Sequence, residues 1–427
     1  MKTLLLASGL FVATAMGVVY YDDLVAATRP PVKEAGPTLP TLPTPTPTPT
    51  PMPTPVRLPA TDPSQSVINA ASHSPRIDLV FALDTTGSMS GMINAAKEKI
   101  WSIASTMANA QVAPIIRVGL VAYRDRGDAY ITRMVDLTDD LDAMYAALMQ
   151  FQASGGGDGP ESVNQALHEA VNKMSWAQED NTYKVVFLVG DAPPHMDYDN
   201  DVPYPETIAL ANKRGIVINT IQCGTSSPAK RDWQKIASLS QGQYFQVGQS
   251  GNAVAIATPY DQPMARLARA LDDTRLAYGS RKERAVVEEK RSRVNEVMSA
   301  APAASAARRA AFNASVSGKA NLLGDKDLVA DVQSGAIDIA AVRKDHLPAE
   351  LRDLRTDEAR AVLQKRAQKR QSIEKEIQQL SAQRQAFIRD QLTTTGSSDS
   401  LDDKIFATVR AQAAGKGLRY EAVQPQY

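Results

Sequence analysis

Short apolar segments alternate with helical segments between residues 76 and 278, and this alternation constrains the fold more than any other feature of the sequence. Four of the segments are rich in β-branched and aromatic residues and apolar almost throughout, which is typical of strands covered on both faces in a parallel sheet. They are residues 77–83, 115–123, 183–189 and 216–222. A more polar strand at 130–137 is expected at a sheet edge, and a sixth strand is expected at 242–247.

Helical segments fill the intervals between these strands. They are expected at residues 88–108, 139–152, 160–174, 205–214, 229–239 and 262–278. Strands and helices that alternate at this spacing predict a doubly wound α/β domain, with a mostly parallel six-stranded sheet flanked by helices. In such sheets, ligands bind beyond the carboxyl ends of the strands, near the point where the strand order reverses.

The N-terminal residues have the pattern of a targeting segment. Lys2 is followed by residues 3–21 without a charged side chain, so residues 1–22 are expected to be a signal peptide or a membrane anchor. Either alternative places the rest of the chain outside the cytoplasm, in the periplasm or secreted. Residues 23–75 include 44-TPTPTPTPMPTP-55 and are expected to be a disordered, extended linker.

The composition changes again after residue 278. Residues 279–395 are rich in Ala, Arg, Lys, Glu and Gln and are expected to be helical and partly coiled coil, with a long helix at 354–392. Arg366, Arg370 and Arg384 interrupt the apolar seam of that helix, which favours a helical hairpin or a partner-facing helix. Residues 396–427 are expected to be a C-terminal tail with a short helix.

Charge and cysteine content exclude several classes of protein. The 47 basic and 47 acidic residues give a formal net charge of zero, whereas a nucleic-acid-binding protein usually has a basic excess. The single cysteine, Cys223, excludes an intrachain disulfide and a multi-cysteine zinc site, and it is expected in the core.

The first strand ends in a group of hydroxyl residues behind one aspartate, 81-FALDTTGSMSGMI-93. The string around Ser88 and Ser90 has Met89 where a nucleophile elbow needs its serine, so it does not match that motif. No lysine follows in the position that a phosphate-binding loop requires, and 155-GGGDGP-160 lacks the third glycine of a dinucleotide fingerprint. His168-Glu169 does not begin a zincin motif, because Asn172 occupies the position of the second histidine.

A metal site is the interpretation of this loop that these motifs leave open. Asp84, Thr86 and Ser88 lie two residues apart on a loop that turns from a strand into a helix, so their oxygens can converge. One carboxylate and two hydroxyls suit Mg²⁺ or Mn²⁺ better than zinc, with Ca²⁺ less favoured. Three oxygens do not saturate such an ion, so water or a partner's carboxylate must complete it.

The string D-T-T-G-S-M resembles the D-x-S-x-S motif of the metal-ion-dependent adhesion site in von Willebrand factor type A domains, with Thr86 in place of the first serine. The resemblance covers residues 76–278 and implies further ligands from two other strand-end loops. Asp191 in 187-FLVGDAPPH-195 matches the aspartate of the third loop. The second loop, 155-GGGDGPESVNQAL-167, has no threonine, so Asp158 or Glu161 would substitute. Together these loops look like a bacterial subgroup of the family, and like the type A domains beside atypical kinases.

Other residues near these loops have structural interpretations. His195 is expected to anchor its loop, Asp125 to support the metal loops, and the acids of 197-DYDND-201 to be solvated rather than to bind Ca²⁺. Arg126-Gly127-Asp128 is expected in a connection between strands.

Three hypotheses for function follow. The first is a non-catalytic, extracytoplasmic protein-binding module for adhesion or scaffolding, in which Mg²⁺ accepts an acidic residue of a protein partner. The second is a structural subunit of an envelope assembly without metal dependence. The third, a metal-dependent hydrolase, is the least favoured, because no general base has a recognisable spacing from the motif.

Overall fold

The computed structural model describes residues 74–157, 159–251, 256–319, 321–324, 326–395 and 401–421. The expected signal peptide or anchor, most of the expected linker, and the candidate ligand Asp158 lie outside the described residues.

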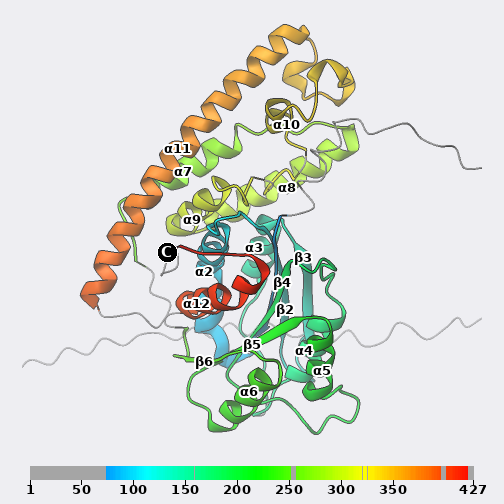
Figure 1. The fold of residues 1–427 in the computed structure, drawn as a ribbon, viewed down its shortest axis with the longest axis vertical. Helices are drawn as coiled ribbons and strands as arrows, with labels where there is room; N and C mark the ends of the chain where they lie inside the picture. The colour runs from blue at the N-terminus through cyan, green and yellow to red at the C-terminus, as the bar shows by residue number, and fades with distance from the viewer. Residues whose placement is uncertain are drawn as a thin grey trace, which may run out of the picture. The chain divides into compact units, whose positions relative to one another are not determined.

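Six strands form one sheet in the order β3-β2-β1-β4-β5-β6 (Figure 1). Only β3, at the edge, runs antiparallel to its neighbour; the other pairs are parallel. The strands are β1 (Arg76–Asp84), β2 (Ile115–Tyr123), β3 (Thr132–Thr138), β4 (Thr182–Gly190), β5 (Ile216–Cys223) and β6 (Tyr244–Val247). This confirms the predicted doubly wound sheet, including its polar edge strand. The strand order reverses between β1 and β4. Because β1, β2 and β4 are parallel, the loops after these three strands meet at one edge of the sheet.

Helices cover both faces of the sheet, which is why the central strands are apolar at nearly every position. Ile77 and Leu79 of β1 belong to the core under α2 (Ser90–Ala108) and α3 (Leu141–Gln150). Val80, which points the other way, packs in the core under the helices of the opposite face. Those helices are α4 (Val163–Asn172), α5 (Tyr204–Lys213) and α6 (Ser227–Leu239). Cys223 is fully buried, as expected.

The short C-terminal helix α12 (Leu401–Ala413) packs on the sheet beside α2, where it is coloured red in Figure 1. Ile405 is buried in the same core as β1 and β4. Lys99 of α2 and Asp402 of α12 form a buried ion pair at 3.0 Å. A short 3-10 turn, Ala414–Lys416, follows. The segment after the long helix therefore contributes directly to the core of the sheet domain.

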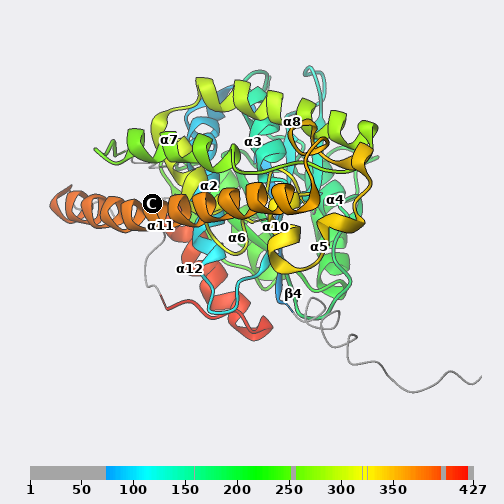
Figure 2. The same cartoon turned by 90° about the horizontal axis from the view of Figure 1, so that it is seen from above.

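The remaining helices form a second layer of packing above the sheet domain (Figures 1 and 2). They are α7 (Asp261–Asp272), α8 (Arg281–Ala300), α9 (Ala303–Asn313), α10 (Leu328–Ser334) and α11 (Thr356–Thr395), with 3-10 turns at Ile339–Ala341, Lys344–His346 and Ala349–Leu351. Helices α7, α9 and α11 share one apolar cluster. Helix α7 ends at Asp272, six residues before the predicted end of that segment.

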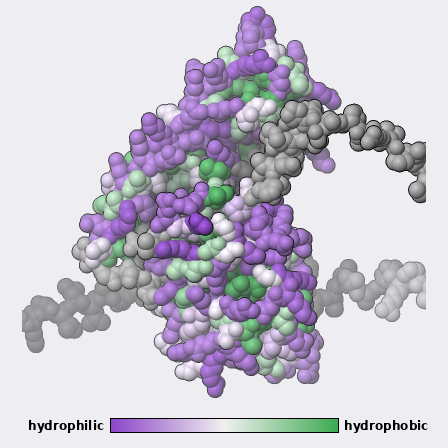
Figure 3. Space-filling view, in the orientation of Figure 1, coloured by the Kyte–Doolittle hydropathy of each residue, from purple (hydrophilic) through white to green (hydrophobic). Residues whose placement is uncertain are grey.

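Helix α11 is one continuous helix that packs on its own chain, so the coiled-coil and hairpin interpretations of this segment are not supported. The arginines of its seam bind neighbouring segments: Arg370 pairs with Asp327 at 2.8 Å, and Arg384 pairs with Asp261 at 2.7 Å. Arg366 donates to the carbonyl of Asp273 at 2.8 Å. The face of α11 seen in Figure 3 is largely hydrophilic. Among the described residues, none of the helices has both the length and the hydropathy needed to cross a bilayer.

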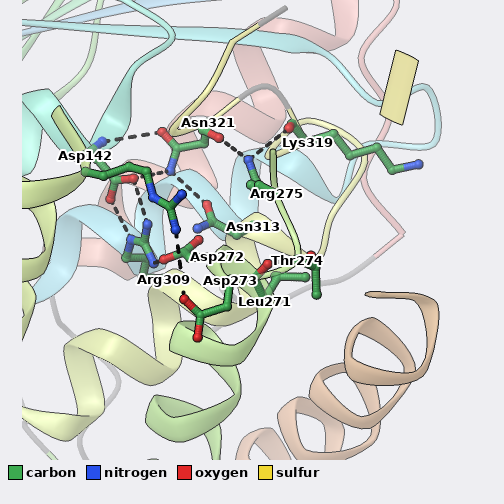
Figure 4. Close-up of polar contacts among 11 residues, drawn as sticks. Asp142, Leu271, Asp272, Asp273, Thr274, Arg275, Arg309, Asn313, Lys319 and Asn321 are labelled. Carbon is green, nitrogen blue, oxygen red and sulfur yellow. Dashed lines mark hydrogen bonds and ion pairs between the residues drawn. The ribbon is translucent and has the colours of Figure 1, made fainter. Parts of the chain in front are cut away.

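A buried polar cluster joins the helical layer to the sheet domain (Figure 4). Arg309 of α9 donates to both carboxylate oxygens of Asp142 in α3, at 2.5 and 2.8 Å, and to Asp272 of α7 at 2.6 Å. Asn321 donates to Asp142 at 3.2 Å. Because a two-pronged pairing of a guanidinium with a carboxylate also sets their orientation, this cluster fixes α9 relative to α3 and α7.

Candidate metal site

The loop after β1 gathers the three oxygens of the predicted metal motif. Asp84 Oδ1 accepts hydrogen bonds from Thr86 N at 2.8 Å and from Thr86 Oγ1 at 2.7 Å. Thr86 Oγ1 lies 3.4 Å from Ser88 Oγ, at the start of the 3-10 turn Gly87–Met89. Asp84 Oδ2 is buried and has no hydrogen-bond partner among the residues that the structure describes. One carboxylate oxygen therefore orders the loop, and the other has no protein donor.

The environment of Asp84 disfavours its charge. Burial raises the pKa of Asp84 to about 7, although the two hydrogen bonds from Thr86 act in the opposite direction. The charge of Asp191 adds a further increase, and the backbone N–H of Asp191 a smaller decrease. A nearby cation would reverse this shift, because it would favour the ionised carboxylate.

The second loop brings Glu161 to the same place. Glu161 is 4% exposed, and its Oε2 atom is buried without a hydrogen-bond partner. Burial, followed by the charges of Asp84, Asp125, Asp128 and Asp191, raises the pKa of Glu161 to about 9.

Gly156 permits the close approach of the first and second loops. Its φ of +82° is one that glycine adopts easily, and a Cβ atom here would lie 3.1 Å from Glu161 Oε1 and 3.2 Å from Thr86 Cβ. Main-chain bonds hold the loops together as well, from Gly87 N to Gly155 O at 3.0 Å and from Ser154 N to Thr85 O at 3.1 Å.

The third loop places Asp191 directly after β4. Gln249, from the loop after β6, donates its side-chain amide to Asp191 Oδ2 at 2.6 Å and to Ser88 O at 3.2 Å. Gly190, the last residue of β4, packs so closely that a Cβ atom would lie 2.5 Å from the Tyr123 hydroxyl and 3.1 Å from Asp84 Oδ2. The structure thus brings Asp84, Thr86, Ser88, Glu161 and Asp191 to one edge of the sheet.

Asp125 and His195 form a layer behind the second loop. Asp125 Oδ1 accepts from Ser162 Oγ at 2.9 Å, and Asp125 Oδ2 lies 3.3 Å from His195 Nε2. His195 also contacts Asp197 at 2.8 Å and stacks on Tyr198. These contacts agree with the structural roles expected for Asp125 and His195.

The Arg126-Gly127-Asp128 sequence is engaged within the chain. Arg126 pairs with Asp201 at 2.5 Å and lies over the ring of Tyr198. Asp128 accepts from the backbone N–H groups of Asp125 and Gly156. These contacts give both charged side chains a role in ordering the strand-end loops.

Sequence reasoning missed one residue of this edge, Gln249, whereas it placed Tyr123 on the same rim of the sheet as the metal loops. Gln249 lies some 160 positions after Asp84, in a loop with no recognised motif, so nothing in its neighbourhood indicates the contact. Tyr123 closes an apolar strand and reads as a core residue. Its position at the end of β2 indicates that it lies beside the three loops, because β1 and β2 pair in register up to Asp84 and Tyr123.

The donor set fits a hard divalent cation, through a mixture of carboxylate and hydroxyl oxygens. Within the described ranges, no group of three or more His, Cys, Asp or Glu side chains is arranged to hold a metal ion. The fit therefore depends on the hydroxyls of Thr86 and Ser88. It also depends on the two buried carboxylate oxygens, Asp84 Oδ2 and Glu161 Oε2, which lack protein donors.

Comparison with known families agrees with this geometry. Residues 78–259 match a family model described as von Willebrand factor A domain. The match covers the sheet and all three loops, and it supports a von Willebrand factor A domain in this part of the chain.

The similar relatives match about a quarter of this chain. A stretch of 119 residues is 31% identical to the putative ariadne-like RING finger protein R811 of Acanthamoeba polyphaga mimivirus, over 28% of this chain and 11% of that protein. A stretch of 98 residues is 37% identical to von Willebrand factor A domain-containing protein 7 of Mus musculus and of Homo sapiens, over 23% of this chain and 10% of each relative. The chain thus spans about a tenth of the length of these relatives.

Solved structures of proximal thread matrix protein 1 from the mussel byssus are similar at 18% identity and a TM-score of 0.33, over 41% of this chain and 42% of that one. Another structure of that mussel protein, with the same identity and TM-score over 40% of this chain, is described as having a zinc-occupied MIDAS motif.

Proposed function

We propose that this chain is a non-catalytic, extracytoplasmic protein-binding module whose von Willebrand factor A domain binds a partner through a divalent cation, with Mg²⁺ as the physiological ion. Asp84, Thr86 and Ser88 would hold the cation, and Asp191 and either Glu161 or Asp158 would complete the protein side of the site. The observation that carries the proposal is the buried Asp84 Oδ2 atom, which lacks a donor beside two hydroxyls on the same loop.

The charges of the strand-end loops support a cation. Burial, and to a smaller extent the charge of Asp191, raises the pKa of Asp84. Burial, followed by the charges of Asp84 and other nearby carboxylates, raises the pKa of Glu161, so a cation at this edge would relieve both groups. Two neutral hydroxyl ligands would neutralise less of the cation's charge than carboxylates do. When bound, the cation would supply a Lewis-acidic position able to accept a carboxylate oxygen from a protein partner.

The location outside the cytoplasm rests on the N-terminal sequence. An uncharged run after Lys2 and a proline-rich segment before residue 76 have the composition of an export signal or anchor and an extended spacer. In this proposal the spacer holds the domain away from the membrane surface, and the C-terminal helices offer a second interaction surface.

A pull-down from envelope extracts tests the proposal. The full chain is used with Mg²⁺, with chelator, and as the Asp84→Asn variant, with Glu206→Ala in the exposed first turn of α5 as the matched control. A partner retained by wild type and by the control, and lost with chelator and with Asp84→Asn, is the expected result. A partner retained under all conditions would instead support a structural subunit whose interactions do not depend on metal.

A further inference from the structure

Buried arginines are numerous in the helical layer, and among the described ones Arg308 of α9, like Arg275, lacks a carboxylate partner. Arg309, Arg370 and Arg384 each contact at least one carboxylate at 2.8 Å or less. Arg308 is only 4% exposed, and within the described part of the chain no carboxylate lies within 4.0 Å of its guanidinium. Its Nη1 donates to the carbonyl of Glu98 at 3.1 Å, and its Nε–H is buried without an acceptor.

Arg308 borders a small cavity between α2, α7, α9 and α11. The cavity is also lined by Arg384, by the hydroxyl residues Ser102 and Ser105, and by Met264. Its volume of about 10 Å³ is enough for about one water-sized species. Ser381 of α11 lines it as well, so two cationic side chains and three hydroxyl side chains surround a space the size of a single small species.

Arg308 lacks the direct carboxylate contact that the other cations around this cavity have. Arg384 is paired with Asp261, and Lys99 of α2 is paired with Asp402 of α12. Glu98 of α2 favours the charge of Arg308 without forming an ion pair with it among the described residues, and a guanidinium stays protonated in proteins. Burial, and next the like charge of Arg384, lower the pKa of Arg308 to about 10, although Asp402, Glu98 and Asp261 act in the opposite direction. An unpaired buried charge is strongly unfavourable unless a counter-ion accompanies it.

We propose that this cavity binds a monovalent anion of chloride size as the counter-ion of Arg308. The anion accepts the hydrogen bond that Arg308 Nε–H does not make within the chain, and it reduces the repulsion between Arg308 and Arg384. Because α2 belongs to the sheet domain and α7, α9 and α11 to the helical layer, the anion stabilises the docking of these two parts. This site is separate from the candidate metal site and does not depend on it.

Thermal unfolding of the full chain tests the anion site. Chloride replaces gluconate at constant ionic strength, so that only the anion changes. The melting temperature is expected to rise with chloride and to saturate, as for a ligand that binds the folded state. Bromide is expected to act like chloride. Arg308→Met should remove the rise, and Arg266→Met, an exposed arginine of α7, should retain it.

Bromide in crystals of the wild-type protein locates the site even if Arg308→Met fails to fold. An anomalous peak in the cavity beside Arg308 is the expected result. Equal melting temperatures in chloride and gluconate would overturn the proposal, and so would a chloride effect that persists in Arg308→Met. A cavity without an anomalous peak would also overturn it, because water would then be the occupant.

Discussion

Replacing Asp84 by asparagine should stabilise the metal-free protein relative to the wild type increasingly as the pH rises. Asparagine keeps the Oδ1 acceptor for both hydrogen bonds from Thr86 but cannot ionise. In the wild type, the pKa of Asp84 is raised from 3.8 to about 7 because the folded protein favours its protonated form. The stability that this proton contributes is fully present below 3.8, and it is lost as the pH rises through about 7.

The size of the effect follows from that shift. Well above the folded-state pKa, ionised Asp84 costs the wild type about 4 kcal/mol of unfolding free energy. At about pH 5 the cost is only about 2 kcal/mol, since the folded protein still holds the proton. The amide group that replaces Oδ2 lacks an acceptor and costs about 1–3 kcal/mol, but equally at both pH values. The stability of Asp84→Asn relative to the wild type should therefore increase by about 2–3 kcal/mol between about pH 5 and about pH 8.

Denaturant unfolding followed by circular dichroism, in chelator at both pH values, measures this difference. Loss of the negative charge at position 84 also relieves Glu161, whose pKa Asp84 helps to raise, and this acts in the same direction. A difference between variant and wild type that is the same at both pH values would refute the assignment of Asp84 as a buried, electrostatically disfavoured carboxylate.

Three further changes test other parts of the structure. Arg309→Met leaves Asp142 and Asp272 buried without their partner and should cost about 3–5 kcal/mol in chemical unfolding, whereas exposed Arg293→Met should cost little. Ile405→Ala in α12 should cost about 2–5 kcal/mol, because the side chain is 1% exposed in the core of the sheet domain. Gln249→Ala removes the donor to Asp191 and Ser88 O and should strengthen Mg²⁺ binding in calorimetry.

Each of these has a clear contrary result. Equal losses for Arg309→Met and Arg293→Met would mean that the polar cluster does not hold the two layers together. An Ile405→Ala variant as stable as the wild type would contradict the placement of α12 in the core. Weaker Mg²⁺ binding by Gln249→Ala would indicate that Gln249 supports the cation rather than competing with it for Asp191.

The sheet was predictable because its signals are local. A parallel strand covered on both faces must be apolar along its length, and β1, β2, β4 and β5 agree with their predicted bounds to within one residue at each end. Parallel strands also place their carboxyl ends at one edge. The convergence of Asp84, Glu161 and Asp191 therefore followed from their positions after β1, before α4 and after β4.

The packing of the C-terminal half was not predictable in the same way. Arg370 and Arg384 lie in the apolar seam of α11. The sequence around them does not indicate that they form ion pairs with Asp327 and Asp261, which belong to distant segments of the chain. The burial of α12 beside α2 depends on contacts about 300 residues apart in the chain, such as that between Lys99 and Asp402. Gln249 reaches the metal loops through a similarly long-range contact.

A titration with Mn²⁺, followed by electron paramagnetic resonance of the free ion, tests the central claim most directly. The wild-type chain should bind one Mn²⁺ that excess Mg²⁺ displaces, and Asp84→Asn should lose this site while Glu206→Ala keeps it. Ser88→Ala, which removes one proposed hydroxyl ligand and leaves Asp84 in place, should bind more weakly. Mn²⁺ binding of equal affinity in wild type and Asp84→Asn, or no binding by the wild type, would contradict a metal site at the end of β1.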